Sequence, residues 1–310
     1  PATAALWFAE VLQAADADPA LERRQRDRLG NLFRRQPKPT SLFSPDSHHG
    51  LLRMSPDGRQ LIQSLGHSST DGTGSGEVRF WELATGRLLR SVTIPDLWGT
   101  PYPSPSGRWA AVSGRERKAL WDLTTGQRVP VELEMEGTGG VSLWCHDETL
   151  LALVRYEGTD VYLIEVPSGR RHAPSLQHPY PVISIEFDPS RRWVATGTSI
   201  QRERTRLAPE DKVGQARVWE VHTGRPVTDW IAFRAPVDRL VFSPDGSALA
   251  LFHSGSIGLT SGLKGAEVRV IDLPQGTDRF AALRHADTVV DLAFRDRKST
   301  RLNSSHESPS

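Results

Sequence analysis

From about residue 50 onward, short apolar runs alternate with turn residues along the chain, and this pattern repeats. Residues 213–219 and 268–271 alternate apolar and polar positions with the period of two that is typical of a strand with one buried face. Residues 55–58 read Ser-Pro-Asp-Gly, which places proline at the second position of a turn and glycine where a positive φ is needed. The pattern therefore predicts strands joined by tight hairpins.

Two sequence landmarks recur along this region. Copies of the first, the residue before each Ser-Pro-Asp-Gly-like turn, are 41 to 55 residues apart: Met54, Pro103, Trp144, Phe187, Phe242 and Phe294. The second landmark is a large apolar residue followed by an acidic residue, with a glycine at a fixed distance after the pair. The pairs are Trp81-Glu82, Trp121-Asp122, Ile164-Glu165, Trp219-Glu220 and Ile271-Asp272. A repeat of about 40 to 55 residues with four strand-like runs is the signature of propeller blades rather than of helical solenoids.

The repeats resemble WD40 repeats. The segments MSPDGRQLI, PSPSGRWAA, FDPSRRWVA and FSPDGSALA lead to RFWELATGR, ALWDLTTGQ, RVWEVHTGR and RVIDLPQGT. The resemblance implies an all-β fold, a WD40-type β-propeller over residues 39–295, with five blades and the first strand of a sixth, whereas the family usually has seven blades. The third repeat departs from the pattern at its turn, residues 145–148, and the third and fifth carry isoleucine in place of tryptophan.

The resemblance also implies a structural hydrogen-bond network within a blade. In the family it joins a histidine, a serine or threonine, the landmark tryptophan and an aspartate; the matching residues here are His178, Thr198, Trp219 and Asp211, with His285 as the histidine of the next repeat. Because a satisfied polar network holds a blade together, we expect His178 to be structural rather than catalytic or metal-binding. The remaining blade landmarks are Trp81, Trp121, Asp122, Gly58, Gly107 and Gly246.

The two ends of the chain differ from the repeats. Residues 3–35 have the three-to-four spacing of apolar positions that predicts helices, and Asp18-Pro19 matches a helix start. Residues 1–38 resemble the helical linker before WD40 arrays in large bacterial proteins, many with an upstream serine/threonine kinase. Residues 296–310 begin DRKSTRLNSSH, which resembles a sequencing adapter translated in frame, so we exclude them from fold reasoning. The start at Pro1 indicates a piece of a longer chain.

Composition excludes several classes of partner. The 310 residues carry 38 basic and 37 acidic side chains, a formal net charge of +1, so no overall field attracts nucleic acid or anionic lipid. The single cysteine, Cys145, excludes an internal disulfide and a multi-thiolate zinc site. The apolar stretch near the start is too short to span a bilayer. We expect a cytoplasmic protein with protein partners and no nucleic-acid, membrane or small-molecule partner.

No motif indicates chemistry. Residues 72–76 are glycine-rich but lack the spacing of a phosphate-binding loop. His48, His49 and His67 have no carboxylate or thiol at ligand spacing, and no Gly-x-Ser-x-Gly elbow accompanies Cys145. We therefore assign no catalytic, cofactor-binding or metal-ligating residue, and we expect neither cofactor nor enzymatic activity.

The long loops indicate a binding function. Insertions at residues 65–76, 199–214 and 253–265 fall on the face that WD40-like propellers most often use for partners. One of them carries Arg202, Arg204 and Arg206, enough for bidentate contacts to an acidic partner, although a solvated loop is the alternative interpretation.

Three hypotheses about function follow. The leading one is a non-catalytic WD40 scaffold that mediates protein–protein interaction. The alternatives are a regulatory or substrate-docking propeller of a bacterial serine/threonine kinase whose catalytic domain lies upstream, and a propeller hydrolase whose catalytic residues lie in a missing domain or in the central channel.

Overall fold

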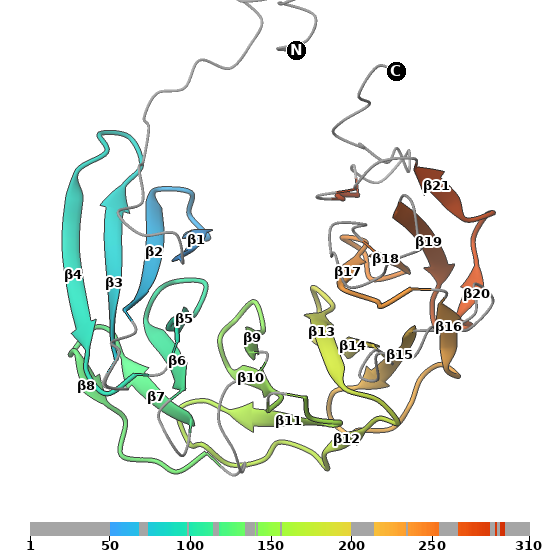
Figure 1. Ribbon diagram of the computed structural model, residues 1–310, viewed down its shortest axis with the longest axis horizontal. Coiled ribbons are helices and arrows are strands. Elements are labelled where there is room, and N and C mark those ends of the chain that lie inside the picture. The colour runs from blue at the N-terminus through green and yellow to red at the C-terminus, as the bar shows by residue number, and fades with distance from the viewer. Residues whose placement is uncertain are drawn as a thin grey trace, which may run out of the picture. The chain divides into compact units, whose positions relative to one another are not determined.

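A computed structural model shows a chain built from strands (Figure 1). It describes residues 50–67, 74–97, 99–113, 118–133, 140, 142–155, 157–199, 214–233, 235–253, 266–285, 289 and 292–294. These residues contain no helix, and so none that is long and apolar enough to cross a membrane. The all-β class predicted from the repeats is confirmed for this part of the chain.

The strands form antiparallel sheets that follow one another in chain order. The first sheet contains β1 (Gly50–Met54), β2 (Gln60–His67), β3 (Ser75–Glu82) and β4 (Leu88–Ile94). The second contains β5 (Tyr102–Pro103), β6 (Trp109–Ser113), β7 (Lys118–Asp122) and β8 (Gln127–Arg128). The third contains β9 (Ser142–Trp144), β10 (Leu150–Leu153), β11 (Asp160–Glu165) and β12 (Leu176–Gln177).

Two further sheets complete the described part of the chain. The fourth contains β13 (Val182–Phe187), β14 (Trp193–Thr198), β15 (Gly214–Glu220) and β16 (Ile231–Phe233). The fifth contains β17 (Arg239–Phe242), β18 (Ala248–His253), β19 (Ala266–Asp272), β20 (Thr277–Asp278) and β21 (Leu283–His285). Both β20 and β21 pair with β19, at opposite ends of that strand. The five sheets correspond to the five repeats read from the sequence.

The hairpin between β1 and β2 closes through the predicted Ser-Pro-Asp-Gly turn. Ser55 Oγ donates a hydrogen bond of 2.6 Å to Asp57 Oδ1, and Gly58 follows with a φ of +68°. The same position is taken by Gly107 in the second sheet and Gly246 in the fifth, with φ of +72° and +70°. Glycine reaches this left-handed region without a steric penalty, so the turn chemistry accounts for the tight connection.

Successive sheets pack on one another through shared apolar clusters. Buried side chains from both sheets of each pair include Phe80 and Ala110, Leu120 and Leu151, Leu163 and Phe187, and Phe233 and Leu251. Hydrogen bonds cross three of these interfaces: Ser64 Oγ to Pro101 O (2.5 Å), Trp144 Nε1 to Tyr102 O (2.9 Å) and Ser184 Oγ to Val237 O (2.6 Å). Four-stranded antiparallel meanders that pack face to face in chain order are the architecture of a β-propeller.

The predicted first strand of a sixth blade is not formed by the described residues. Residues 289 and 292–294 form no strand; instead Val289 and Leu292 are buried against side chains of β18 and β19. The predicted helices of residues 1–38 and the adapter-like residues 296–310 lie outside the described residues.

Candidate functional site

Two buried side chains of the fourth sheet and one from the connection between β12 and β13 meet in one hydrogen-bond chain. Trp219 Nε1 donates to Thr196 Oγ1 at 2.9 Å, and Thr196 Oγ1 lies 2.8 Å from His178 Nε2. On its other side, His178 Nδ1 lies 2.9 Å from the carbonyl oxygen of Thr159. The exposed fractions of His178, Thr196 and Trp219 are 7%, 0% and 5%, so water does not compete for these contacts.

The direction of the hydrogen bonds defines the protonation state of His178. Because a carbonyl oxygen only accepts, Nδ1 carries the hydrogen, and Nε2 of the neutral ring then accepts from the Thr196 hydroxyl. Burial lowers the pKa of His178 to about 4, and the hydrogen bond to Thr159 opposes this only in part. A neutral imidazole in a satisfied network is a structural group.

The threonine in this network is Thr196 and not Thr198, which the sequence analysis named. Thr198 lies on the same face of β14, but its hydroxyl bonds the backbone of Gln215, at 3.0 Å to the oxygen and 3.1 Å from the nitrogen. Trp219 pairs with Val194, so Thr196 is two positions away along the strand and Thr198 four. A residue adds about 3.3 Å to a strand, which puts Thr198 beyond hydrogen-bond range of the indole.

The other predicted residues lie apart from this network. Trp81 Nε1 donates to Gln63 Oε1 at 3.1 Å in the first sheet, and Trp121 packs against the cluster between the first two sheets. Asp122 Oδ1 accepts from Thr124 N at 2.8 Å and so closes the turn after β7. His285 ends β21 opposite Ala266 of β19. Predicted residues that lie outside the described residues are Asp211, Arg202, Arg204 and Arg206.

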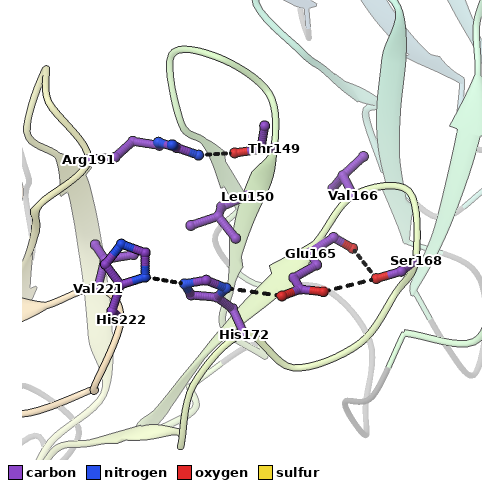
Figure 2. Close-up of a pocket in the computed structure, with 9 residues that line it drawn as sticks. All are labelled: Thr149, Leu150, Glu165, Val166, Ser168, His172, Arg191, Val221 and His222. Carbon is purple, nitrogen blue, oxygen red and sulfur yellow. Dashed lines mark hydrogen bonds and ion pairs between the residues drawn. The ribbon is translucent and has the colours of Figure 1, made fainter.

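A cleft of about 310 Å³ lies between the turns of the third and fourth sheets (Figure 2). Its lining residues are Thr149, Leu150, Glu165, Val166, Ser168, His172, Arg191, Val221 and His222. Aliphatic side chains and polar groups line it together, and the polar ones come from both sheets. Its volume and mixed lining make it a candidate for a binding site.

A carboxylate and two imidazoles form a chain along one wall of the cleft. His172 Nδ1 lies 3.1 Å from Glu165 Oε1, and His172 Nε2 lies 3.2 Å from His222 Nδ1 (Figure 2). The hydrogen bond from His172, with the charge of Arg170 further away, lowers the pKa of Glu165. Glu165 is therefore ionised at neutral pH and acts only as an acceptor.

Arg191 borders the opposite side of the cleft. Its Nη1 donates to Thr149 Oγ1 and lies 3.0 Å from Asp147 Oδ2, so the side chain crosses from the fourth sheet to the turn of the third (Figure 2). Arg191 occupies the turn position that other sheets give to glycine and has a φ of +60°. Glu148 is its counterpart in the third sheet, with a φ of +62°.

The turn that holds Glu148 also contains the single cysteine. Cys145 stands where Ser55 and Ser243 stand in their turns: Sγ donates to Asp147 Oδ1 at 3.0 Å and accepts from Leu150 N at 3.1 Å. Burial and the neighbouring Asp147 raise the pKa of this thiol. A buried thiol with a raised pKa is a poor nucleophile, so Cys145 replaces serine in a structural role.

Two buried titratable groups lie away from the cleft. Lys118 is 3% exposed, burial lowers its pKa to about 8, and its ammonium donates to Ser142 Oγ at 2.8 Å. Burial raises the pKa of Glu186 to about 7, and the charge of Arg53 acts in the opposite direction. Lys118 thus contacts a serine hydroxyl, whereas the charged neighbour of Glu186 is Arg53; neither contact by itself identifies a reaction.

The described residues place no group of three or more histidine, cysteine, aspartate or glutamate side chains where it would hold a metal ion. Among the described residues, buried His253, 1% exposed, has Asp238 Oδ2 as the acidic group near its Nδ1, at 3.5 Å. Two groups are fewer than the three protein ligands of a catalytic zinc site.

Comparisons with known proteins show the fold alone. No model of a known protein family matches the sequence, and no curated protein matches it. The solved hydrazine synthase of Kuenenia stuttgartiensis is similar over 82% of this chain and 73% of its own, with a TM-score of 0.52 and 14% identity. The β-propeller domain of Cps50 (Swd1) from Myceliophteria thermophila has a TM-score of 0.48 and 14% identity over 75% of this chain and 67% of its own.

Sequence reasoning did not find the cleft. Its polar residues come from four separate segments of the chain. Thr149 precedes β10, Glu165 and His172 lie at and after the end of β11, Arg191 lies in the turn before β14, and His222 lies in the turn after β15. One local signal was present: arginine stands in the turn position where glycine is expected. A charged residue at a position that favours glycine is a reason to examine its surroundings.

Proposed function

We propose that this chain is a non-catalytic scaffold with a WD40-type propeller that binds protein partners in the cytoplasm. The observation that carries the proposal is the cleft between the third and fourth sheets, which combines aliphatic side chains with polar groups from two sheets. Protein-binding sites commonly have this combination of an apolar centre and polar surroundings. The similarity of the sequence to WD40 repeats supports the same conclusion.

The geometry of the cleft supports binding rather than hydrolysis at this site. A carboxylate–histidine pair activates a hydroxyl when that hydroxyl lies at the second nitrogen of the imidazole. Here the second nitrogen, His172 Nε2, faces His222 Nδ1, whereas the hydroxyl of Ser168 lies 3.4 Å from Glu165 Oε2. The pair therefore lacks a nucleophile where catalysis requires one.

Affinity capture followed by binding of purified components tests the proposal. We expect a protein to co-purify with the full chain and to bind it in isothermal titration calorimetry after both are purified separately. Charge reversal in the cleft, Arg191→Glu, should weaken that binding at least tenfold, whereas Arg59→Glu, on the exposed turn of the first sheet, should not. Hydrolysis of ester, glycoside or phosphoester substrates that is lost in His172→Ala would support the hydrolase instead.

A second candidate is the regulatory or docking propeller of a bacterial serine/threonine kinase. It rests on the resemblance of residues 1–38 to kinase-associated linkers. Sequencing the gene upstream of Pro1 tests it, because kinase catalytic motifs there would support it and a start codon immediately before Pro1 would contradict it.

A further inference from the structure

We propose that the cleft between the third and fourth sheets binds a phosphoryl group carried by a partner protein. This inference rests on the proposed protein-binding function and names the chemistry that the same site recognises. It follows from four features of the cleft: the donors of Arg191, the paired imidazoles, the aliphatic lining and the backbone conformation that presents the arginine.

Arg191 supplies the permanent positive charge. Its contacts to Thr149 Oγ1 and to Asp147 Oδ2 both use Nη1. Among the described residues, the hydrogens of Nε and Nη2 therefore have no acceptor and can bind a ligand. A guanidinium presents its donors in a planar fork that matches two oxygens of a phosphate. The hydroxyls of Thr149 and Ser168 border the same cleft, but they donate to Asp147, at 2.8 Å, and to Glu165, at 3.4 Å, so Arg191 supplies the donors for a ligand.

The two imidazoles supply a charge that depends on the ligand. Ionised Glu165 only accepts, so His172 Nδ1 carries a hydrogen; when the ring carries no second hydrogen, its Nε2 has a lone pair. The contact of 3.2 Å then requires His222 Nδ1 to donate, which leaves the lone pair of His222 on Nε2. One added proton turns this nitrogen into a donor with a positive charge. A dianionic phosphate favours that protonated state.

The carboxylates of the cleft are already engaged. Glu165 accepts from His172 at 3.1 Å and from Ser168 at 3.4 Å and lies 3.6 Å from Arg170, and Asp147 pairs with Arg191. The charged groups at and beside the cleft are thus two carboxylates, Glu165 and Asp147, and their cationic partners, Arg170 and Arg191. An added phosphoryl group meets them as neutralised pairs rather than as isolated anions.

The aliphatic side chains of the cleft suit the carbon stem of a phosphorylated side chain. Leu150, Val166 and Val221 line the cleft beside the polar groups. Free phosphate gains nothing from this surface, whereas the carbon stem of a phosphorylated side chain buries apolar area against it. The cleft thus favours a phosphorylated residue of a protein over inorganic phosphate.

The backbone conformation at Arg191 is unfavourable for a residue with a side chain, which indicates that this side chain has a function. A left-handed conformation costs a residue with a side chain about 1 kcal/mol or more, and Gly58, Gly107 and Gly246 avoid this cost in the equivalent turns. The equivalent Glu148 uses both carboxylate oxygens to bind Ser106 of the second sheet, which makes it a structural contact. Arg191 contacts the third sheet with one nitrogen only and borders the cleft.

The test uses the purified full chain with phenyl phosphate and inorganic phosphate as probes, followed by isothermal titration calorimetry at constant ionic strength. We expect saturable binding, tighter for phenyl phosphate, with proton uptake that appears as a dependence of the heat on the buffer. Sulfate, which stays a dianion, is the control ion. Sulfate that binds as tightly as phosphate, without proton uptake, would overturn the proposal.

Two variants separate the site from the fold. Arg191→Gly should lower affinity for phenyl phosphate at least tenfold while leaving the thermal unfolding midpoint nearly unchanged, because glycine suits the left-handed turn. His222→Gln should abolish the proton uptake. Arg192→Gln, which removes the neighbouring cation outside the cleft, is the matched control and should bind like the wild type. Unaltered affinity in Arg191→Gly would contradict the proposal.

The outcome is distinguishable from that of the proposed function. If phenyl phosphate does not bind but a partner protein does, the phosphoryl site is wrong and the scaffold function stands. If phenyl phosphate binds and no partner protein is found, the cleft recognises phosphoryl groups, but the scaffold function and the assignment of the phosphoryl group to a partner protein are both wrong. Loss of partner binding after phosphatase treatment of the partner would support both.

Discussion

Replacing Thr196 with valine removes one hydroxyl from the interior while it keeps the shape of the side chain. The hydroxyl is fully buried and joins Trp219 Nε1, at 2.9 Å, to His178 Nε2, at 2.8 Å. In Thr196→Val the indole N–H loses its acceptor and the imidazole nitrogen loses its donor. Because the substitution is isosteric, it creates no cavity, and the change in stability reports the hydrogen bonds.

The magnitude follows from the two groups left without partners. A buried donor or acceptor that loses its hydrogen bond costs about 1–3 kcal/mol, so two such groups cost about 2–6 kcal/mol. The extra methyl group gains about 0.8 kcal/mol from burial. We therefore expect Thr196→Val to lower the free energy of unfolding by about 3 kcal/mol, a large share of the roughly 5–15 kcal/mol that stabilises a typical domain.

Urea unfolding followed by tryptophan fluorescence measures this change. The midpoint should fall while the slope of the transition stays constant, which shows that stability and not compactness has changed. Thr196→Ser is the matched control, because it keeps the hydroxyl and loses only a methyl group, at a cost of about 1 kcal/mol. A Thr196→Val protein within about 1 kcal/mol of the wild type, or a serine variant as unstable as the valine variant, would refute the reasoning.

Three further predictions concern buried groups. Lys118→Met should raise the free energy of unfolding at pH 7 by about 2–3 kcal/mol, because the fall in the pKa of Lys118 from 10.5 to about 8 corresponds to about 3 kcal/mol of destabilisation. Urea titrations of both proteins should show this gain shrink as pH rises from 8 to 10.5, since the folded wild type loses the proton that the unfolded chain keeps. Gly197→Ala should destabilise by about 1–3 kcal/mol in the same assay, because its Cβ would lie 2.5 Å from the carbonyl oxygen of Val237; an unchanged midpoint would contradict this. NMR should show that His178 stays neutral in the folded protein down to about pH 4. Because His178 of the unfolded chain binds a proton near pH 6.5, this group makes the protein less stable as pH falls from 6.5 to 4. A titration midpoint near pH 6.5 in the folded protein would exclude the neutral network.

Local features of the fold were predictable from the sequence because they depend on neighbours along the chain. The turn before β2 needs proline and glycine at fixed positions, and Gly58 has the positive φ that this requires. The alternation predicted for residues 213–219 reappears as alternating burial over residues 214–218 of β15. Both features repeat with the period of the blades, so one recognised repeat predicted the others.

The same regularity explains where prediction failed. Thr196 and Thr198 are on the same face of β14, and strand periodicity alone does not distinguish them. The distinction comes from the register with β15, in which Trp219 lies opposite Val194 and thus near Thr196. Register is a property of the paired strands, so a count along one strand selected the wrong threonine.

Sequence alone therefore determined the all-β class, the hairpin turns and the five-fold repeat, since each follows from interactions within about fifty residues of one repeat. The cleft depended on tertiary structure, because packing of the third sheet on the fourth brings Glu165 and His172 to His222 and carries Arg191 to Thr149. Contacts between sheets involve residues with no shared period or spacing. Their geometry is a consequence of packing, and for that reason the binding chemistry of this protein became visible only in three dimensions.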